Sequence, residues 1–236
     1  MHNFLLKNAL WLIIVACIVS RLPQLVNISY VLDQDECVVG LMAKHFAENK
    51  EIPLFFYGQK YGFAFIEVLF ARIAFLGFGV TDVAMRISML VLWTIGICFH
   101  YKTLKNLVRT TPDAESLYQS YLPLLVTLLF ILCPVWAVWS MKARGGYLTA
   151  FTLFSVVTYL ASHRTRFQHW SFQALIGVLL VVIFQAQPLF LVGLLPLLFY
   201  FEYPKKSILR IGAVGFGVLA TAVLFHFLKN HPIRDF

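Results

Sequence analysis

Residues 62–79 read GFAFIEVLFARIAFLGFG, an apolar stretch that carries Glu67 and Arg72 near its middle. A transmembrane helix needs about 20 mostly apolar residues, and this stretch comes close to that length. A charged side chain inside the hydrocarbon core is costly, however, so two of them favour a helix that stays at the surface. Whether the stretch crosses a membrane decides the orientation of every later segment, and hence the fold.

The composition of the whole chain is typical of an integral membrane protein. Of its 236 residues, 60% are hydrophobic and 13% are charged, and the mean hydropathy is +0.79. A soluble domain has about 45–50% apolar and about 25% charged residues. The net charge of +8 indicates contact with anionic lipid and no nucleic-acid partner, because no basic run is long enough to follow a phosphate backbone. The four cysteines have neither paired nor metal-ligand spacing and are expected to be small core or lipid-facing residues: Cys17, Cys37, Cys98 and Cys133.

Eight apolar segments are candidate membrane helices. They are Phe4–Ser20, Gly62–Gly79, Val83–Tyr101, Tyr121–Trp139, Tyr147–Ala161, Trp170–Phe184, Leu189–Phe201 and Ile211–Leu228. No small-residue cleavage site follows the first segment, so we expect an uncleaved span and not a removed signal peptide.

The orientation of these segments follows from three basic loops. They contain Lys102, Lys105 and Arg109, then Arg164 and Arg166, then Lys205, Lys206 and Arg210. Lysine and arginine accumulate on the cytoplasmic side of a membrane in short loops. With the N-terminus inside, all three loops fall inside only if residues 62–79 do not cross. We therefore predict an all-α polytopic bundle of seven spans, one module over residues 1–236, with an outer loop over residues 21–82 that contains a re-entrant or juxtamembrane helix.

An acidic cluster lies in this outer loop, where residues 33–36 read DQDE. Apolar residues then recur at helical spacing (Val38, Leu41, Met42, His45 and Phe46), which predicts an amphipathic helix on the membrane surface. Asp35 or Glu36 would stand at its N-terminus, where backbone N–H groups favour negative charge. Capping explains one acid but not three, so a catalytic base or a cation site facing water is the alternative.

Two further loops on the same side carry candidate functional groups. Lys142 and Arg144 lie in an outer loop, against the positive-inside rule. Either an anionic ligand requires them, or they are the stray basic residues that short outer loops sometimes contain. Residues 58–62 read GQKYG, and their glycines allow either a close approach of backbone to a ligand or a plain connection between helices.

The order of these motifs resembles the GT-C membrane glycosyltransferases, in particular the bacterial proteins grouped with protein O-mannosyltransferases and lipid A aminoarabinose transferases. The resemblance rests on the Asp35-Glu36 pair opening a surface helix, Pro53, the YGQKYG stretch at 57–62, Gly77, Gly79 and Arg86 before the next span, and the GGY sequence at 145–147. It covers residues 10–160 well and the remainder as apolar spans alone. Many relatives carry an acid where this chain has Lys142 and Arg144, and they are usually longer, which suggests an N-terminal module or a truncated copy.

The resemblance implies a sugar donor carried on a polyprenyl phosphate, a lipid, glycan or protein acceptor, and an active site on the outer face of the plasma (inner) membrane. Asp35 would be the catalytic base and Glu36 its partner. Substrate-binding candidates are Asp33, Gln59, Lys60, Tyr61, Arg86, Lys142, Arg144 and Tyr147. Positive side chains among them could stabilise the leaving phosphate. Two close carboxylates, Asp33 and Asp35, could hold Mn²⁺ or Mg²⁺.

Two other functions stay open at this point. A transporter or flippase component for lipid-linked glycans would more often bury ionisable groups within broken helices at mid-membrane. Here the acids cluster at the mouth, and the segments 121–139 and 211–228 contain none, which favours the enzyme. An inactive partner subunit is the third possibility. No glycine-rich nucleotide loop is present in the sequence, in agreement with a lipid-linked donor.

Overall fold

The computed structural model describes residues 6–26, 32–59, 61–109, 117–163, 170–194 and 208–228. Over these residues the chain is all-helical, which confirms the predicted class, and β pairing is limited to an isolated bridge between Phe55 and Phe63. The helices are α2 (Ala9–Val19), α3 (Leu22–Val26), α4 (Gln34–Ala47), α5 (Phe65–Phe78), α6 (Asp82–Arg109), α7 (Leu117–Leu132), α8 (Pro134–Trp139), α9 (Tyr147–Ser162), α10 (Trp170–Ala186) and α12 (Ile208–Leu228).

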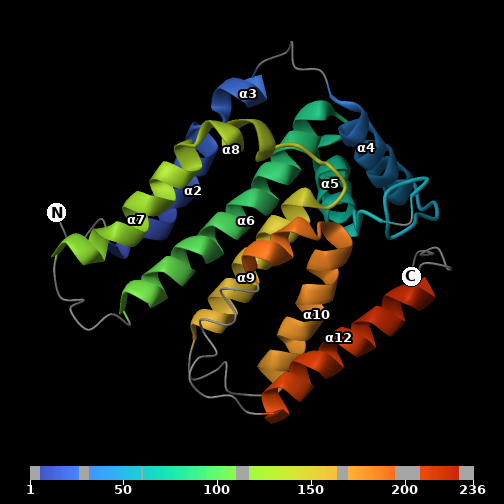
Figure 1. Ribbon diagram of the computed structural model, residues 1–236. Helices are drawn as coiled ribbons and strands as arrows, with labels where there is room; N and C mark the ends of the chain where they lie inside the picture. Colours follow the sequence, from blue (N-terminus) through green and yellow to red (C-terminus); the bar gives the residue numbers. More distant parts are fainter. Residues whose placement is uncertain are drawn as a thin grey trace.

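Helices α6 and α9 form the centre of the bundle and run in the same direction (Figure 1). Along their length, the Thr152 hydroxyl donates to the Leu92 carbonyl at 3.0 Å, and the Asn106 amide donates to the Ser162 hydroxyl at 2.9 Å. Both helices therefore begin at the same end of the molecule. We call this end, where Asp82 begins α6 and Tyr147 begins α9, the upper end, as Figure 1 draws it.

Buried Arg21 joins four helices at the upper end. It follows α2, and its Nε donates to the Ser140 hydroxyl after α8 at 2.8 Å, while Nη2 donates to the Ile131 carbonyl of α7 at 2.9 Å. Its guanidinium also lies over the Trp93 ring of α6, 4.7 Å from the centroid. Because these bonds satisfy a buried charge, α2, α7 and α8 are held against α6 at this end.

On the other side of the bundle, α10 packs on α9 and α12 packs on α10. A Cβ atom on Gly177 would lie 2.3 Å from the Val214 carbonyl oxygen, and one on Gly217 would lie 2.2 Å from that of Ala174. The two helices are thus in backbone contact. Small residues allow such an approach between apolar helices, where a larger side chain would force them apart.

Helix α5 begins and ends at the upper end. Near its start, Glu67 accepts hydrogen bonds from the backbone at the start of α9, and Gly79 after its end leads almost directly into α6. Its 14 residues cover about 21 Å, against about 30 Å for the hydrocarbon core of a bilayer. Arg72 lies over the Phe46 ring of α4 at 3.9 Å from the centroid, so the helix keeps its second charge against an aromatic face.

Helix α4 buries a different face from the predicted one. Its buried residues are Glu36, Val39, Met42, Ala43 and Phe46. Predicted Leu41 is 45% exposed, and Val38 and His45 are half-buried. The shift arises because the helix packs against α5 with Glu36 turned inward, a tertiary contact that periodicity in the sequence does not contain.

Within the described part of the chain, two helices can cross a membrane by length and composition: Ala9–Val26 and Asp82–Arg109. The second runs past its predicted end at Tyr101, so Lys102, Lys105 and Arg109 lie on the helix and not in a loop, which corrects the prediction. The predicted span 121–139 is divided into α7 and α8, because Pro134 starts a new helix after Cys133. Most of the predicted span 189–201, and the basic residues Arg164, Arg166, Lys205 and Lys206, lie outside the described residues.

Candidate functional site

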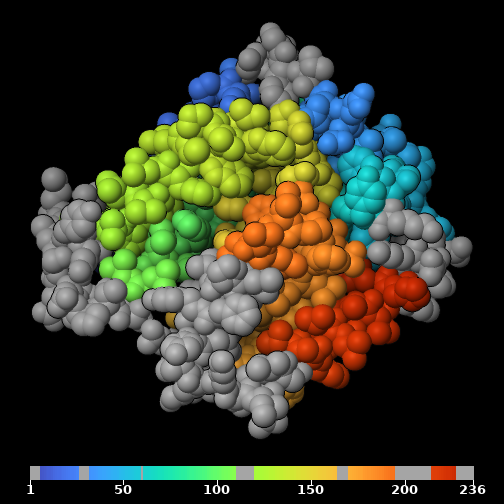
Figure 2. Space-filling model, in the orientation of Figure 1, coloured from blue at the N-terminus to red at the C-terminus, as the bar shows by residue number. Residues whose placement is uncertain are grey.

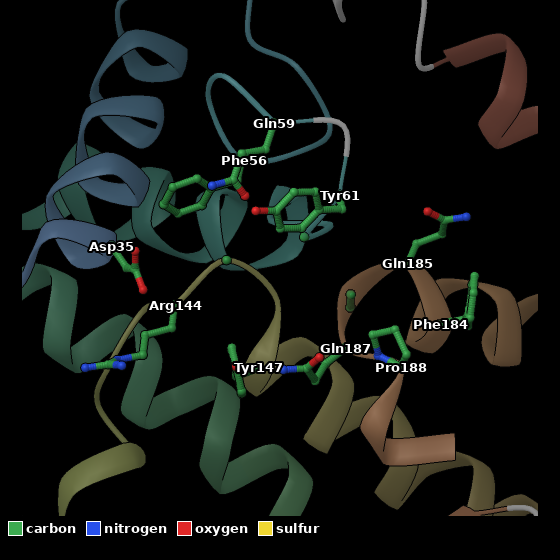
Figure 3. A pocket seen from close by; sticks show the side chains of 13 residues that line it. Asp35, Phe56, Gln59, Tyr61, Arg144, Tyr147, Phe184, Gln185, Gln187 and Pro188 are labelled. Carbon is green, nitrogen blue, oxygen red and sulfur yellow. The ribbon is translucent and has the colours of Figure 1, made fainter. Parts of the chain in front are cut away.

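A cavity of about 650 Å³ opens at the upper end, within the range of about 300–1,000 Å³ common for ligand sites. Three separate segments form its wall: the connection between α4 and α5, the loop before α9, and the end of α10 (Figure 3). In Figure 2 the cyan surface of the first segment borders the orange surface of the third. The lining residues are Asp35, Phe56, Gln59, Tyr61, Gly62, Arg144, Gly145, Tyr147, Phe184, Gln185, Ala186, Gln187 and Pro188.

Glycines allow the three segments to meet. Gly145 has φ +64°, and a Cβ there would lie 2.6 Å from the Phe56 ring. Gly146 has φ +116°, and a Cβ there would lie 2.9 Å from the carbonyl oxygens of both Phe63 and Ala186. An L side chain is strained at these φ values and would also clash. The GGY sequence therefore has a structural reason: its glycines pass between the other two walls of the cavity.

Two of the three clustered acids close the N-terminus of α4. The Asp33 carboxylate accepts the Glu36 N–H at 3.0 Å, and the Glu36 carboxylate accepts the Asp33 N–H at 2.9 Å. This reciprocal pair is a capping box. Capping thus explains two acids where the sequence argument allowed one. Glu36 is fully buried, and its carboxylate is part of this cap.

Lys142 and Arg144 form an ion cluster with the same acids. The Lys142 Nζ and the Arg144 Nη2 lie 2.9 and 2.5 Å from Asp33 Oδ2, and Lys142 Nζ lies 4.0 Å from Glu36 Oε2. Burial alone would raise the pKa of Asp33, but the bonds and charges of Lys142 and Arg144 outweigh it and lower that pKa. Burial raises the pKa of Glu36. These ion pairs give the two basic residues a structural role that the sequence alone did not show.

Asp35 is the remaining acid, and it is the one that lines the cavity. It is exposed, and over the described residues no hydrogen bond or ion pair engages its carboxylate. In Figure 3 the Asp35 carboxylate points toward Arg144 on one side of the cavity, while Phe184, Gln185 and Pro188 occupy the opposite side. The Asp35 carboxylate and the Arg144 guanidinium therefore lie on one side of the cavity, and the wall that carries the Gln185 amide lies on the other.

The other predicted site residues separate into two groups. Gln59, Tyr61 and Tyr147 line the cavity with Asp35 and Arg144, whereas Lys60 lies outside the described residues. Arg86 does not line the cavity: Nη1 donates to the Gln24 carbonyl at 2.9 Å and Nη2 to Asp82 Oδ2 at 2.8 Å. This nearly buried side chain joins α3 to α6, so its prediction as a substrate ligand is not supported by its position.

The two acids considered for Mn²⁺ or Mg²⁺ do not fit a metal. Both Asp33 oxygens already accept bonds, Oδ1 from Glu36 and Oδ2 from Lys142 and Arg144. Among the described residues, no group of three or more His, Cys, Asp or Glu side chains could hold a metal ion. A divalent cation prefers several oxygen ligands. The chemistry of the cavity is therefore derived below from its own side chains.

The end of α10 is a wall of the cavity that the sequence argument missed. It contributes Phe184, Gln185, Gln187 and Pro188. The Phe63 N–H donates to the Gln185 carbonyl at 3.0 Å, which attaches this end to the α4–α5 connection. A signal was present, because two glutamines and a proline directly follow a long apolar segment. Amide side chains at the end of an apolar helix are positioned to bind hydroxyl groups at its mouth.

A smaller apolar pocket of about 180 Å³ adjoins the cavity. Tyr147 lines both, and the remaining lining is Val135, Trp136, Trp139, Leu148 and Phe190. Trp139 also contacts Tyr147, with centroids 5.4 Å apart, and the Arg144 guanidinium lies 4.6 Å from its ring centroid. An apolar slot therefore lies directly beside the guanidinium of the polar cavity.

Comparison of the chain with protein-family models, with curated proteins and with solved structures returned no match.

Proposed function

We propose that the protein is a membrane-embedded glycosyltransferase that moves a sugar from a polyprenyl-phosphate donor to an acceptor at the outer face of the membrane. The observation that carries this proposal is the cavity itself, in which unpaired Asp35 and the Arg144 guanidinium lie side by side opposite Gln185 and Gln187. A base, a cation for a leaving phosphate and amides for sugar hydroxyls are the groups that such a transfer requires.

The transfer follows from these groups. Asp35 takes the proton of the acceptor hydroxyl as its oxygen forms a bond to the anomeric carbon of the sugar. The bond from that carbon to the phosphate oxygen breaks, the polyprenyl phosphate leaves with the electron pair, and the anomeric configuration inverts. General-base assistance of this kind contributes about 10²–10⁴ in rate. Arg144 stabilises the charge that develops on the phosphate, and the glutamines hold the sugar ring.

Arg144 is the better candidate of the two basic residues for contact with phosphate. Its side chain is 29% exposed and lines the cavity, while that of Lys142 is 14% exposed and lies within the ion cluster. Asp33 holds the guanidinium at the wall before a substrate arrives. A phosphate would take over part of that pairing, so Lys142 serves to keep Asp33 neutralised when Arg144 turns to the donor.

The apolar pocket suits the lipid portion of the donor. It shares Tyr147 with the cavity and adjoins the Arg144 guanidinium through Trp139. A phosphate held by Arg144 would leave its first isoprene unit beside this pocket, where burial of apolar surface stabilises the complex by roughly 25 cal/mol per Å². The described geometry thus supports an amphiphilic donor better than a soluble one.

The multi-pass topology belongs to this proposal. We propose seven spans with the N-terminus inside and the upper end outside, because α5 begins and ends at that end and Lys102, Lys105 and Arg109 lie toward the other. Impermeant thiol reagents test it in intact cells, with cysteines placed at Asn106 and at exposed Gln59 in a background lacking the native cysteines. Labelling at position 59 but not at 106 is expected, and the reverse pattern contradicts the topology.

The function is tested by a transfer assay in membranes with radiolabelled polyprenyl-phosphate sugars and a mixture of lipid and glycan acceptors. Product formation that depends on the protein and on Asp35 is expected. Translocation of a fluorescent lipid-linked sugar without transfer would instead identify a flippase component. If the well-folded protein shows neither transfer nor translocation, the result contradicts the enzyme and favours the inactive partner subunit.

A further inference from the structure

Glu67 lies directly behind the cavity wall. It belongs to α5, is fully buried, and Oε1 accepts the N–H groups of Gly146 and Leu148 at 3.0 Å and of Thr149 at 3.3 Å. These are the first backbone groups of α9, which follows immediately on Arg144. A buried acid therefore holds the base of the loop that carries two cavity residues.

We propose that Glu67 is the positioning residue of the cavity, whose carboxylate fixes the start of α9 and thereby the places of Arg144 and Tyr147 in the wall. The effect of Glu67 on donor binding rests on the proposed function. The effect of Glu67 on the loop is independent of that function, and the two effects can be measured separately.

The start of α9 needs a cap from elsewhere in the chain. The first N–H groups of a helix have no partner within the helix, and a side chain at the N-cap usually accepts one of them. Here the N-cap is Gly146, which has no side chain and is required by its left-handed φ and its tight contacts. Glu67 from α5 supplies the missing acceptor, so the loop geometry and the acid depend on one another.

The charge of Glu67 matters because its surroundings are uncharged. Burial raises the pKa of Glu67 to about 7, against the lowering effect of the N–H groups of Gly145, Gly146, Leu148 and Thr149. The helices packed against α5 carry these charged and titratable groups: Asp35, Glu36, Cys37, Lys44 and His45 on α4; Asp82, Arg86, Cys98, His100, Tyr101, Lys102, Lys105 and Arg109 on α6; and Tyr147 and Tyr159 on α9. Over the described residues, no hydrogen bond or ion pair joins the Glu67 carboxylate to any of them, and Oε2 has no partner.

The proton on Glu67 therefore affects how firmly the loop is held. The pKa of about 7 lies above the ordinary value of 4.5, so burying Glu67 behind the loop is more favourable when it is protonated than when it is ionised. As the pH rises from 6 to 8, the arrangement in which Oε1 accepts the N–H groups at the start of α9 loses stability relative to one that opens Glu67 to water. Arg144 and Tyr147 are then held less firmly in the wall.

The experiment is hydrogen exchange of the full-length protein in detergent, read by mass spectrometry on a peptide covering residues 142–152, for wild type and Glu67→Gln. The substitution keeps the shape and an acceptor oxygen but removes the charge, and it lies outside the peptide, so intrinsic exchange rates are identical. At pH 6 the two proteins should be protected alike in this peptide, because Glu67 is then mostly protonated. From pH 6 to 8 the protection factor of the wild type alone should fall about tenfold, so at pH 8 the wild type should exchange faster than the variant.

Glu48→Gln is the matched control, since Glu48 is exposed at the end of α4 and should leave the peptide unchanged at every pH. His45→Gln removes a histidine bonded to Tyr57 in the neighbouring wall and should keep the wild-type pH profile. Equal protection in wild type and Glu67→Gln at pH 8 would overturn the proposal. So would a flat wild-type profile from pH 8 to 6, which can be measured even if the variant does not fold.

The functional arm uses the radiolabelled polyprenyl-phosphate sugar. The apparent KM of the wild type for this donor should rise about tenfold from pH 6 to 8, with the acceptor KM unchanged, and Glu67→Gln should remove this pH dependence of donor KM. A purely structural role would lower the amount of active enzyme and leave KM unchanged. If wild type transfers no sugar, the proposed function fails, while the exchange experiment still decides the role of Glu67.

Discussion

The upper end and the contact between α10 and α12 are held together by opposite means. At the upper end, polar groups dominate: Asp33 pairs with Lys142 and Arg144, and Glu67 accepts three N–H groups of α9. Between α10 and α12, glycines bring two backbones into direct contact. Charge and hydrogen bonding therefore set the geometry of the first region, and steric fit sets that of the second.

This difference predicts how each region responds to substitution. An isosteric change that removes the charge of an exposed or partly solvated group should disturb the upper end and its chemistry while leaving global stability nearly intact, whereas fully buried Glu67 makes stability depend on pH. A single added methyl group should do the reverse between α10 and α12, since packed interiors do not yield to extra volume.

Asp35→Asn should have the largest effect. The variant keeps the size and hydrogen bonding of the side chain but cannot accept a proton, so transfer should fall by about 10²–10⁴. Its unfolding temperature should not change, because Asp35 is exposed and makes no bond within the described chain. Radiolabelled transfer and thermal unfolding in detergent measure the two quantities, with Glu48→Gln as the control for removal of an acid. Near-wild-type transfer by Asp35→Asn would remove Asp35 as the base.

Gly217→Ala should destabilise the protein without touching the cavity. The added Cβ would lie 2.2 Å from the Ala174 carbonyl oxygen, so the helices must separate, at a cost of about 1–3 kcal/mol or more. Gly215→Ala is a matched control two residues away, because no atom lies within 4 Å of its Cβ. Thermal unfolding of both variants decides the matter. Equal stability of the two would mean that α10 and α12 do not pack as described.

Glu67→Gln should change how stability depends on pH. The folded-state pKa of about 7 lies above the ordinary value of 4.5, so the contribution of Glu67 to stability is complete below pH 4.5 and is lost as the pH rises through about 7. The difference is on the order of 3 kcal/mol between these limits. Wild type should thus lose stability from pH 5 to 8, and the variant should lose less. Parallel pH profiles in thermal unfolding would contradict the buried ionisation.

How far the sequence predicts this structure differs between the two regions. The all-α class and the position of Asp35 at a helix start on the side of Arg144 follow from composition and motif order. The ion cluster could not be predicted, because Asp33 and Lys142 lie 109 positions apart and neither shows its partner locally. The wall at Gln185 and Gln187 was missed although its glutamines follow an apolar segment visibly, because the segments that it faces lie far away along the chain. In the sequence Glu67 is only an unfavourable charge in an apolar segment, because the N–H groups that it accepts belong to residues 146–149.

Arg144→Gln should affect the donor and not the acceptor. Loss of a charge-assisted contact with phosphate should raise the apparent KM for the donor about tenfold. Lys142→Gln should raise it less, because Lys142 is 14% exposed and faces Asp33 and Glu36. Steady-state kinetics at varied donor concentration make the comparison. A larger effect at Lys142 than at Arg144 would exchange the roles assigned to them.

Asp33→Asn should have the smallest effect, and it tests whether the ion pairs at the upper end contribute to global stability. Asparagine caps a helix about as well as aspartate, so α4 keeps its cap and loses only the ion pairs with Lys142 and Arg144. Because these pairs are partly solvated, stability should fall by about 1 kcal/mol or less at pH 7. The pKa of Asp33 is lowered in the folded protein, so its stabilisation is present above its ordinary pKa of 3.8 and is lost as the pH falls below that value.

The difference between Asp33→Asn and wild type should therefore be constant from pH 5 to 8 and should shrink as the pH falls below 3.8, as followed by thermal unfolding at a series of pH values. Donor KM should change in the opposite sense to the Arg144 variant, because a guanidinium released from Asp33 is free to meet the phosphate. A stability loss of several kcal/mol would mean that the ion cluster, like the glycine contact, is a determinant of the fold and that the separation between the two regions fails.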